Sequence, residues 1–179
     1  MKLNVVLAVS LLTAGLAMYA GNATAQMEKT KERIGVYDSR AIAVAFVGSE
    51  SFSKWMSDLM VKLEKAKAAG DHERVAELQR EGTERQRLMH KQGFSTAPVD
   101  NILEQIKDRL PAVNEKAGVD LLVSKWDNEA LAKHSSAERV DVTMALIDAI
   151  HPTERQRNSA IAIQKHEPIP LEKADKIKD

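Results

Sequence analysis

The chain has 179 residues, of which 44% are hydrophobic, a composition that suits one globular domain rather than a disordered or fibrous protein. Basic and acidic side chains number 26 each, so the formal net charge is zero and electrostatics do not favour binding to nucleic acid. The chain contains no cysteine, which excludes a disulfide-stabilised domain and a lipoprotein anchored through cysteine.

The N-terminus is typical of a cleavable signal peptide. A positive charge at Lys2 precedes an apolar stretch at residues 5–18, and Ala23 and Ala25 form a small-x-small cleavage site. We therefore expect residues 1–25 to be removed on export to the periplasm, with the extracellular medium as the second choice. The apolar stretch is shorter than the roughly 20 residues of a spanning helix, so we expect no integral membrane segment after cleavage.

The first predicted strand lies at residues 33–38. Apolar Ile34 and Val36 stand at alternate positions, which is the period of a strand with one buried face. Alanine dominates residues 39–47, so a short helix is favoured there over a continuation of the strand.

A long helical excursion is predicted between residues 50 and 117, because two apolar stripes repeat there in alternating steps of four and three. This pattern is typical of helices that pack side by side. The first stripe consists of Phe52, Met56, Leu59, Leu63 and Ala66, and the second consists of Val99, Leu103, Ile106, Leu110, Val113 and Ala117.

The first helix of the excursion is expected at residues 50–69, with Gly70 as its C-cap. Asp71 fits the N-cap of a second helix at residues 72–92, so a tight reversal or sharp kink belongs between the two.

The apolar stripe of the second helix is thin. Val75, Leu78 and Met89 lie on one side of it, but Gly82 and Arg85 occupy positions where the stripe would continue. This predicts a seam that is partly solvated or that binds something other than its neighbouring helix.

A loop is expected at residues 93–98. Phe94 within it is interpreted as an anchor tucked into the core, with a contact to a ligand as the alternative. Residues 99–117 are predicted to form the third helix, with a kink at Pro111. Gly118 is expected to supply its C-cap.

The second predicted strand, at residues 119–125, carries consecutive apolar residues suited to burial on a sheet. Residues 130–134 are interpreted as a short strand or loop, and residues 143–150 as a core helix with one apolar face. The remaining residues, 151–179, are interpreted as a peripheral tail with one helix.

These elements predict an α+β fold that is mostly helical, in which a small β-sheet body carries an inserted long helical hairpin. The predicted domain spans residues 26–150, between the signal peptide and the tail.

The sequence shows no catalytic, cofactor-binding or metal-binding constellation. None of the five histidines has a partner at the spacing of a helical metal site, and no Gly-rich phosphate loop or nucleophile elbow is visible. We therefore expect a non-enzymatic protein without a metal or cofactor.

Three short segments resemble the Skp or OmpH-like periplasmic chaperone family. They are RIGVYDSR at residues 33–40, EKAGVDLLV at residues 115–123, and VDVT at residues 140–143 with Leu146 and Ile147 behind it. This distant resemblance implies a trimer whose strands build the body, and whose helical hairpins surround a cavity that holds unfolded outer-membrane proteins.

The leading function hypothesis is an ATP-independent periplasmic chaperone that binds unfolded outer-membrane or exported proteins. The alternative is a non-enzymatic envelope scaffold or interaction protein with a Skp-like oligomerisation body. Either reading implies a homo-oligomer, because a sheet of few strands leaves unpaired edges. A chaperone would hold unfolded chains by burial against apolar groups on its helical arms, and methionine suits varied surfaces. The expected client-binding residues are Phe52, Trp55, Met56, Met60 and Met89.

Overall fold

A computed structural model of the chain describes residues 31–177, so the predicted signal peptide at residues 1–25 lies outside the described residues. The elements in chain order are β1 (Arg33–Tyr37), α1 (Ser39–Phe46), α2 (Glu50–Ala68), α3 (His72–Phe94), α4 (Asp100–Leu103), η1 (Glu104–Arg109), α5 (Leu110–Ala117), β2 (Leu121–Ser124), α6 (Asn128–Lys133), β3 (Glu138–Asp141), α7 (Thr143–Ile150), α8 (Glu154–Ile163) and α9 (Leu171–Ala174).

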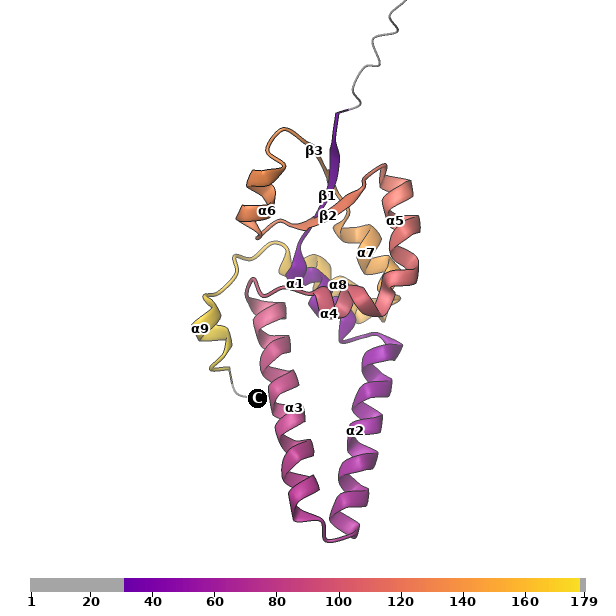
Figure 1. The fold of residues 1–179 in the computed structure, drawn as a ribbon, viewed down its shortest axis with the longest axis vertical. Coiled ribbons are helices and arrows are strands. Elements are labelled where there is room, and N and C mark those ends of the chain that lie inside the picture. Colours follow the sequence, from indigo (N-terminus) through magenta and orange to yellow (C-terminus); the bar gives the residue numbers. More distant parts are fainter. Residues whose placement is uncertain (1–30, 178–179) are drawn as a thin grey trace, which may run out of the picture. The chain divides into compact units, whose positions relative to one another are not determined.

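The three strands form one parallel sheet in the order β2-β1-β3 (Figure 1). Ile34 of β1 is paired with Leu121 of β2 and with Arg139 of β3. The strands before and after the helical excursion therefore hydrogen-bond in a common sheet, and the predicted α+β class with a small sheet and mostly helical structure is confirmed.

Both faces of the sheet are covered. On one face, Ile34 and Val123 pack with Leu131 of α6 and Ala137. The other face joins the main core, whose buried members include Tyr37, Ala41, Ile42, Phe46, Val99, Ile102, Ile106, Val113, Val119, Val142, Leu146, Ile147 and Ile150. The prediction of only one buried face for β1 is wrong, because Gly35 and Tyr37 are buried as well as Ile34.

Helices α2 and α3 pack against each other along the half that is distant from the sheet. Asp71 caps α3, as the sequence predicts, and Ser49 caps α2. Gly70, predicted as the C-cap of the first helix, instead follows the C-cap residue Ala69 and has a positive φ of 67°. Figure 1 shows the two helices closest together at this turn and further apart near α1. Their mutual contact consists of Leu59, Leu63 and Ala66 from α2 and Val75 and Leu78 from α3, with Trp55 at its edge.

The third predicted helix is interrupted at Ile106 rather than at Pro111, where the sequence predicts the kink. Residues 104–109 form the 3-10 helix η1, in which Ile106 leaves helical geometry (φ −118°, ψ 15°). Pro111 stands in the first turn of α5, where the missing N–H would have no helical partner in any case. The predicted αL C-cap at Gly118 is confirmed by its φ of 63°.

Two short elements differ from the prediction. Residues 130–134 form no strand or loop, because most of them belong to α6, where Asp127 accepts a hydrogen bond of 2.9 Å from the Ala130 backbone N–H. Strand β3 lacks the apolar alternation of a half-buried strand, since Glu138 and Arg139 are exposed.

The segment after residue 150 packs on the domain rather than extending from it. Helix α8 lies against α1, where Ala160 is fully buried. The short helix α9 lies against α3 and buries Ala174 completely. Within residues 31–177, every helix is too short or too polar to cross a lipid bilayer.

Candidate functional site

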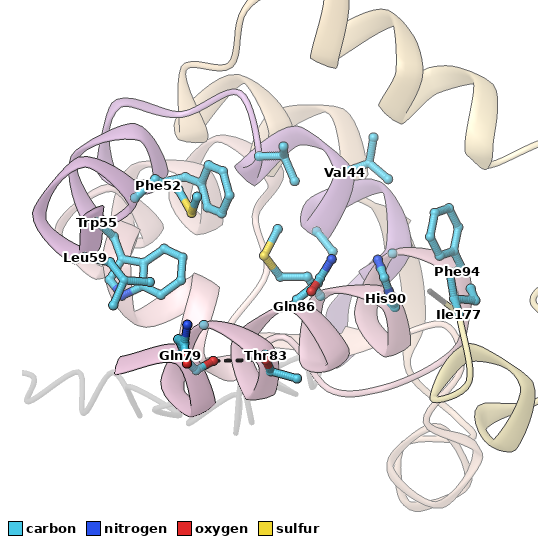
Figure 2. Close-up of a pocket in the computed structure, with 16 residues that line it drawn as sticks. Val44, Phe52, Trp55, Leu59, Gln79, Thr83, Gln86, His90, Phe94 and Ile177 are labelled. Atoms are coloured by element: carbon cyan, nitrogen blue, oxygen red, sulfur yellow. Dashed lines mark hydrogen bonds between the residues drawn. The ribbon is translucent and has the colours of Figure 1, made fainter. Parts of the chain in front are cut away.

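An open apolar groove lies between α2 and α3, and α1 contributes Ala43 and Val44 to its wall (Figure 2). It has a volume of about 940 Å³, which is within the upper range of ligand pockets in proteins. Its lining consists of Ala43, Val44, Val47, Phe52, Trp55, Met56, Leu59, Gln79, Gly82, Thr83, Gln86, Met89, His90, Gly93, Phe94 and Ile177.

Along the groove, α3 presents few large apolar side chains, because Gln79, Gly82, Thr83 and Gln86 line it before Met89. A Cβ atom built on Gly82 would lie 3.5 Å from the Leu59 Cδ2 atom, so glycine leaves room at the point where the packed seam ends. The thin stripe in the second helix therefore predicts this gap correctly.

Aromatic rings close one end of the groove. The rings of Phe46 and Phe52 lie 6.0 Å apart, and those of Phe52 and Trp55 also lie 6.0 Å apart. The Arg85 guanidinium lies 5.0 Å from the Trp55 ring centroid, an arrangement that favours a cation–π interaction. Arg85 interrupts the apolar stripe of α3, and its guanidinium stacks on the Trp55 ring of α2.

The opposite end of the groove is formed by His90, Phe94 and Ile177 (Figure 2). The rings of His90 and Phe94 lie 5.8 Å apart, and Phe94 is 42% exposed. Interpreting Phe94 as a core anchor is therefore wrong. Because α3 continues to Phe94, its final turn presents this ring at the rim of the groove instead.

Four of the five predicted client-binding residues line this one groove: Phe52, Trp55, Met56 and Met89. Met60 lies outside the lining and is 49% exposed on α2. Met56 (38% exposed) and Val61 (50% exposed) are further exposed apolar side chains on α2.

Sequence reasoning missed the parts of the lining that come from outside the hairpin. These are Ala43, Val44 and Val47, at or just after α1, and Ile177 near the C-terminus. Small apolar residues in a short helix give no signal that distinguishes a groove wall from an ordinary core position.

Apart from the groove, a cluster of charged and hydrogen-bonded side chains surrounds Asp38, at the carboxyl end of β1. Its carboxylate accepts hydrogen bonds from Arg40 Nε (3.2 Å) and Nη2 (3.0 Å) and from Trp126 Nε1 (3.1 Å). The Lys125 ammonium lies 2.8 Å away from the same carboxylate. Asp38 and Arg40 are each only 1% exposed.

This buried Asp38 network connects elements of the fold and is not an open binding site. The remaining Arg40 donor Nη1 reaches the His166 carbonyl at 2.7 Å, and the Asp38 backbone N–H donates to the Thr143 hydroxyl at 3.0 Å. Arg40 and Lys125 also lie 4.8 and 4.6 Å from the Trp126 ring centroid. The network therefore joins β1, the turn after β2, α7 and the segment after α8.

Titratable side chains give no metal centre in the part of the chain that the structure describes: no three His, Asp or Glu residues come together there in a way that could hold a metal ion. The groove is therefore the candidate ligand site among residues 31–177, and much of its lining is suited to apolar contact.

No protein-family model, curated protein or solved structure matches this chain.

Proposed function

We propose that this protein is a non-enzymatic, ATP-independent chaperone-like protein of the periplasm that holds unfolded outer-membrane or other exported polypeptides. The single observation that supports the proposal is the open groove of about 940 Å³ between α2 and α3. Its apolar walls offer burial to side chains of an unfolded chain without requiring a fixed sequence, because the hydrophobic effect is non-directional.

The composition of the groove suits variable clients. Met56 and Met89 face it from opposite helices, and methionine side chains adapt their shape through three rotatable bonds. Met60 and Val61 are further exposed apolar side chains on α2, outside the groove. An extended polypeptide could therefore place one side chain in the groove and others along α2.

Self-association is part of the proposal. In the order β2-β1-β3, β2 and β3 each have one side without a strand partner among the described residues, and Leu121 on β2 is 40% exposed. Such edges favour pairing with another chain. Light scattering of the mature protein should give a mass above that of one chain, and a clean monomer would remove this part of the proposal.

The proposed activity is tested by aggregation suppression without added nucleotide. A β-barrel protein unfolded in urea is diluted into buffer with stoichiometric amounts of the wild type or a variant. The double variant Met56→Ser/Met89→Ser makes the groove polar, whereas Met56→Leu/Met89→Leu keeps it apolar at similar volume.

Wild type and the leucine variant should suppress aggregation, and the serine variant should lose most of this activity. Absence of protection by the wild type would refute the proposed function. Equal protection by the serine variant would show that the groove is not where clients bind. Circular dichroism of both variants establishes that the comparison is between folded proteins.

A further inference from the structure

The segment Ile169–Ile177, which we name the C-terminal strap, runs from the end of α3 back along that helix. It begins with two hydrogen bonds: Ile169 N–H donates to the Phe94 carbonyl at 3.0 Å, and the Ser95 hydroxyl donates to the Ile169 carbonyl at 2.6 Å. Helix α9 then packs against α3 with Ala174 fully buried. The strap is therefore directed along the rim of the groove.

The last described residue of the strap enters the groove lining. Figure 2 shows Ile177 beside Phe94 at one end of the groove. Two residues earlier, the Asp175 carboxylate lies 3.1 Å from the Lys91 ammonium on α3. The hydrogen bond from Lys91 and the positive charge of Lys91 lower the pKa of Asp175 below its usual value. The charge of Arg87 makes a smaller contribution in the same direction.

The attachment of the strap is weak in comparison with the core. The side chains of Lys91 and Asp175 are 35% and 47% exposed, and such surface ion pairs contribute little to stability. Helix α9 has only four residues, and Leu171 is 44% exposed. Segments with few buried contacts open at low free-energy cost, and Ala174 is the buried apolar residue of this strap, so we expect the strap to open at a lower cost than the core.

We propose that the C-terminal strap is an internal competitor for the groove, and that clients displace it by presenting the same chemistry. The first element of that chemistry is an acidic side chain that pairs with Lys91, as Asp175 does. The second is an aliphatic side chain two positions later that fills the end of the groove beside Phe94, as Ile177 does. This inference rests on the proposed function for its physiological role, whereas the competition itself is a property of the strap and α3.

The strap explains how an apolar groove can remain covered at one end until a client arrives. A client with a matching acidic and aliphatic pair takes over the Lys91 contact and the position of Ile177. The binding affinity is reduced by the need to displace the strap, because only the fraction of protein with an open groove is competent.

The test uses the full chain and a fluorescent synthetic peptide with the sequence of residues 168–179, added in trans. The double variant Asp175→Lys/Ile177→Ser releases the strap. Leu171→Ser is the matched control, since Leu171 belongs to the strap and is exposed but does not line the groove. Binding is followed by fluorescence anisotropy.

The peptide should bind the released variant roughly tenfold more tightly than it binds wild type or the Leu171→Ser control, the effect expected for burial of part of one aliphatic side chain. Peptides carrying Asp175→Lys or Ile177→Ser should bind the released variant more weakly. Equal binding of the wild-type peptide to all three proteins, including no binding to any of them, would overturn the inference.

A charge swap tests the ion pair separately. Asp175→Lys alone should strengthen binding of the peptide, because the strap loses its ion pair with Lys91. Adding Lys91→Asp restores an ion pair within the protein, so the strap should compete for the groove again. The unmodified peptide should then bind still more weakly, because its own acidic residue would face the acidic side chain introduced at position 91. If the released variant binds the peptide but no protein variant holds an unfolded β-barrel, the strap inference stands and the proposed function fails. If unfolded clients bind all protein variants and the peptide binds all of them equally, the proposed function stands and the strap inference fails.

Discussion

The Trp126 indole N–H donates a hydrogen bond of 3.1 Å to the buried carboxylate of Asp38, a residue 88 positions earlier in the chain. This contact fixes the turn after β2 to the end of β1, at the point where α1 begins. The base from which α2 and α3 extend is thus stabilised by a polar network as well as by the apolar core.

Replacing Asp38 with asparagine should destabilise the fold by about 3–5 kcal/mol, because Arg40 would remain buried without its counter-charge. Equilibrium denaturation in urea measures this free energy. Glu129→Gln is the control, since it removes an acidic residue from the exposed pair with Lys133, and such pairs contribute little. Similar stabilities for the two variants would contradict a central role for the Asp38 network.

Acid should weaken the same network. Burial opposes the ionisation of Asp38, but hydrogen bonds from Arg40, Lys125 and Trp126 outweigh burial and hold its pKa below the usual 3.8. A carboxyl with a lowered folded pKa contributes stability that is present above the unfolded pKa and is lost as the pH falls through the folded pKa.

The free energy of unfolding should therefore decrease as the pH is lowered below about 4, and Asp38→Asn should decrease less steeply over this range. Urea denaturation at several pH values gives both curves. Parallel curves for the wild type and the variant would show that Asp38 does not supply the acid dependence.

How far the sequence predicts this structure depends on whether a feature is local. The caps at Asp71 and Gly118 and the helix at residues 143–150 were predictable because capping chemistry and apolar periodicity lie within a few residues. Phe52 and Met56 were predictable as groove residues because they belong to the apolar stripe of α2, and Met89 because it belongs to the interrupted stripe of α3. Trp55 lies outside both stripes.

Features that depend on tertiary packing could not be derived in this way. Asp38 caps α1 through a local hydrogen bond, but its contacts with Lys125 and Trp126 join positions almost ninety residues apart. Ile177 enters the groove only because residues 164–170 turn back toward α3. Strand β3 is short and polar, and its pairing with β1 rather than its composition makes it a strand.

Gly35 in β1 should tolerate no side chain. A Cβ atom there would lie 2.9 Å from Leu122 Cδ2, 3.0 Å from Val142 Cγ2 and 3.1 Å from Val119 Cγ2, which is closer than ordinary packing. Gly35→Ala should cost about 1–3 kcal/mol of stability through overpacking. An unchanged unfolding midpoint would contradict the tight contact of β1 with the main core.

Gly82 in α3 should respond in the opposite direction. Its added Cβ would meet Leu59 at the ordinary distance of 3.5 Å, and alanine favours a helix interior over glycine by about 0.5–1 kcal/mol. Gly82→Ala should therefore raise the free energy of unfolding, measured by urea denaturation. A loss of stability would show that the space beside Gly82 is smaller than the groove requires.

The most direct test of the groove as the binding site is photo-crosslinking to an unfolded β-barrel client. A photoreactive phenylalanine analogue is placed at Met56 in the groove or at Leu121 on β2, two positions with similar exposed fractions of 38% and 40%. If the groove binds clients, position 56 should give strong crosslinks and position 121 few. Equal crosslinking from both positions, or none from position 56, would contradict binding in the groove.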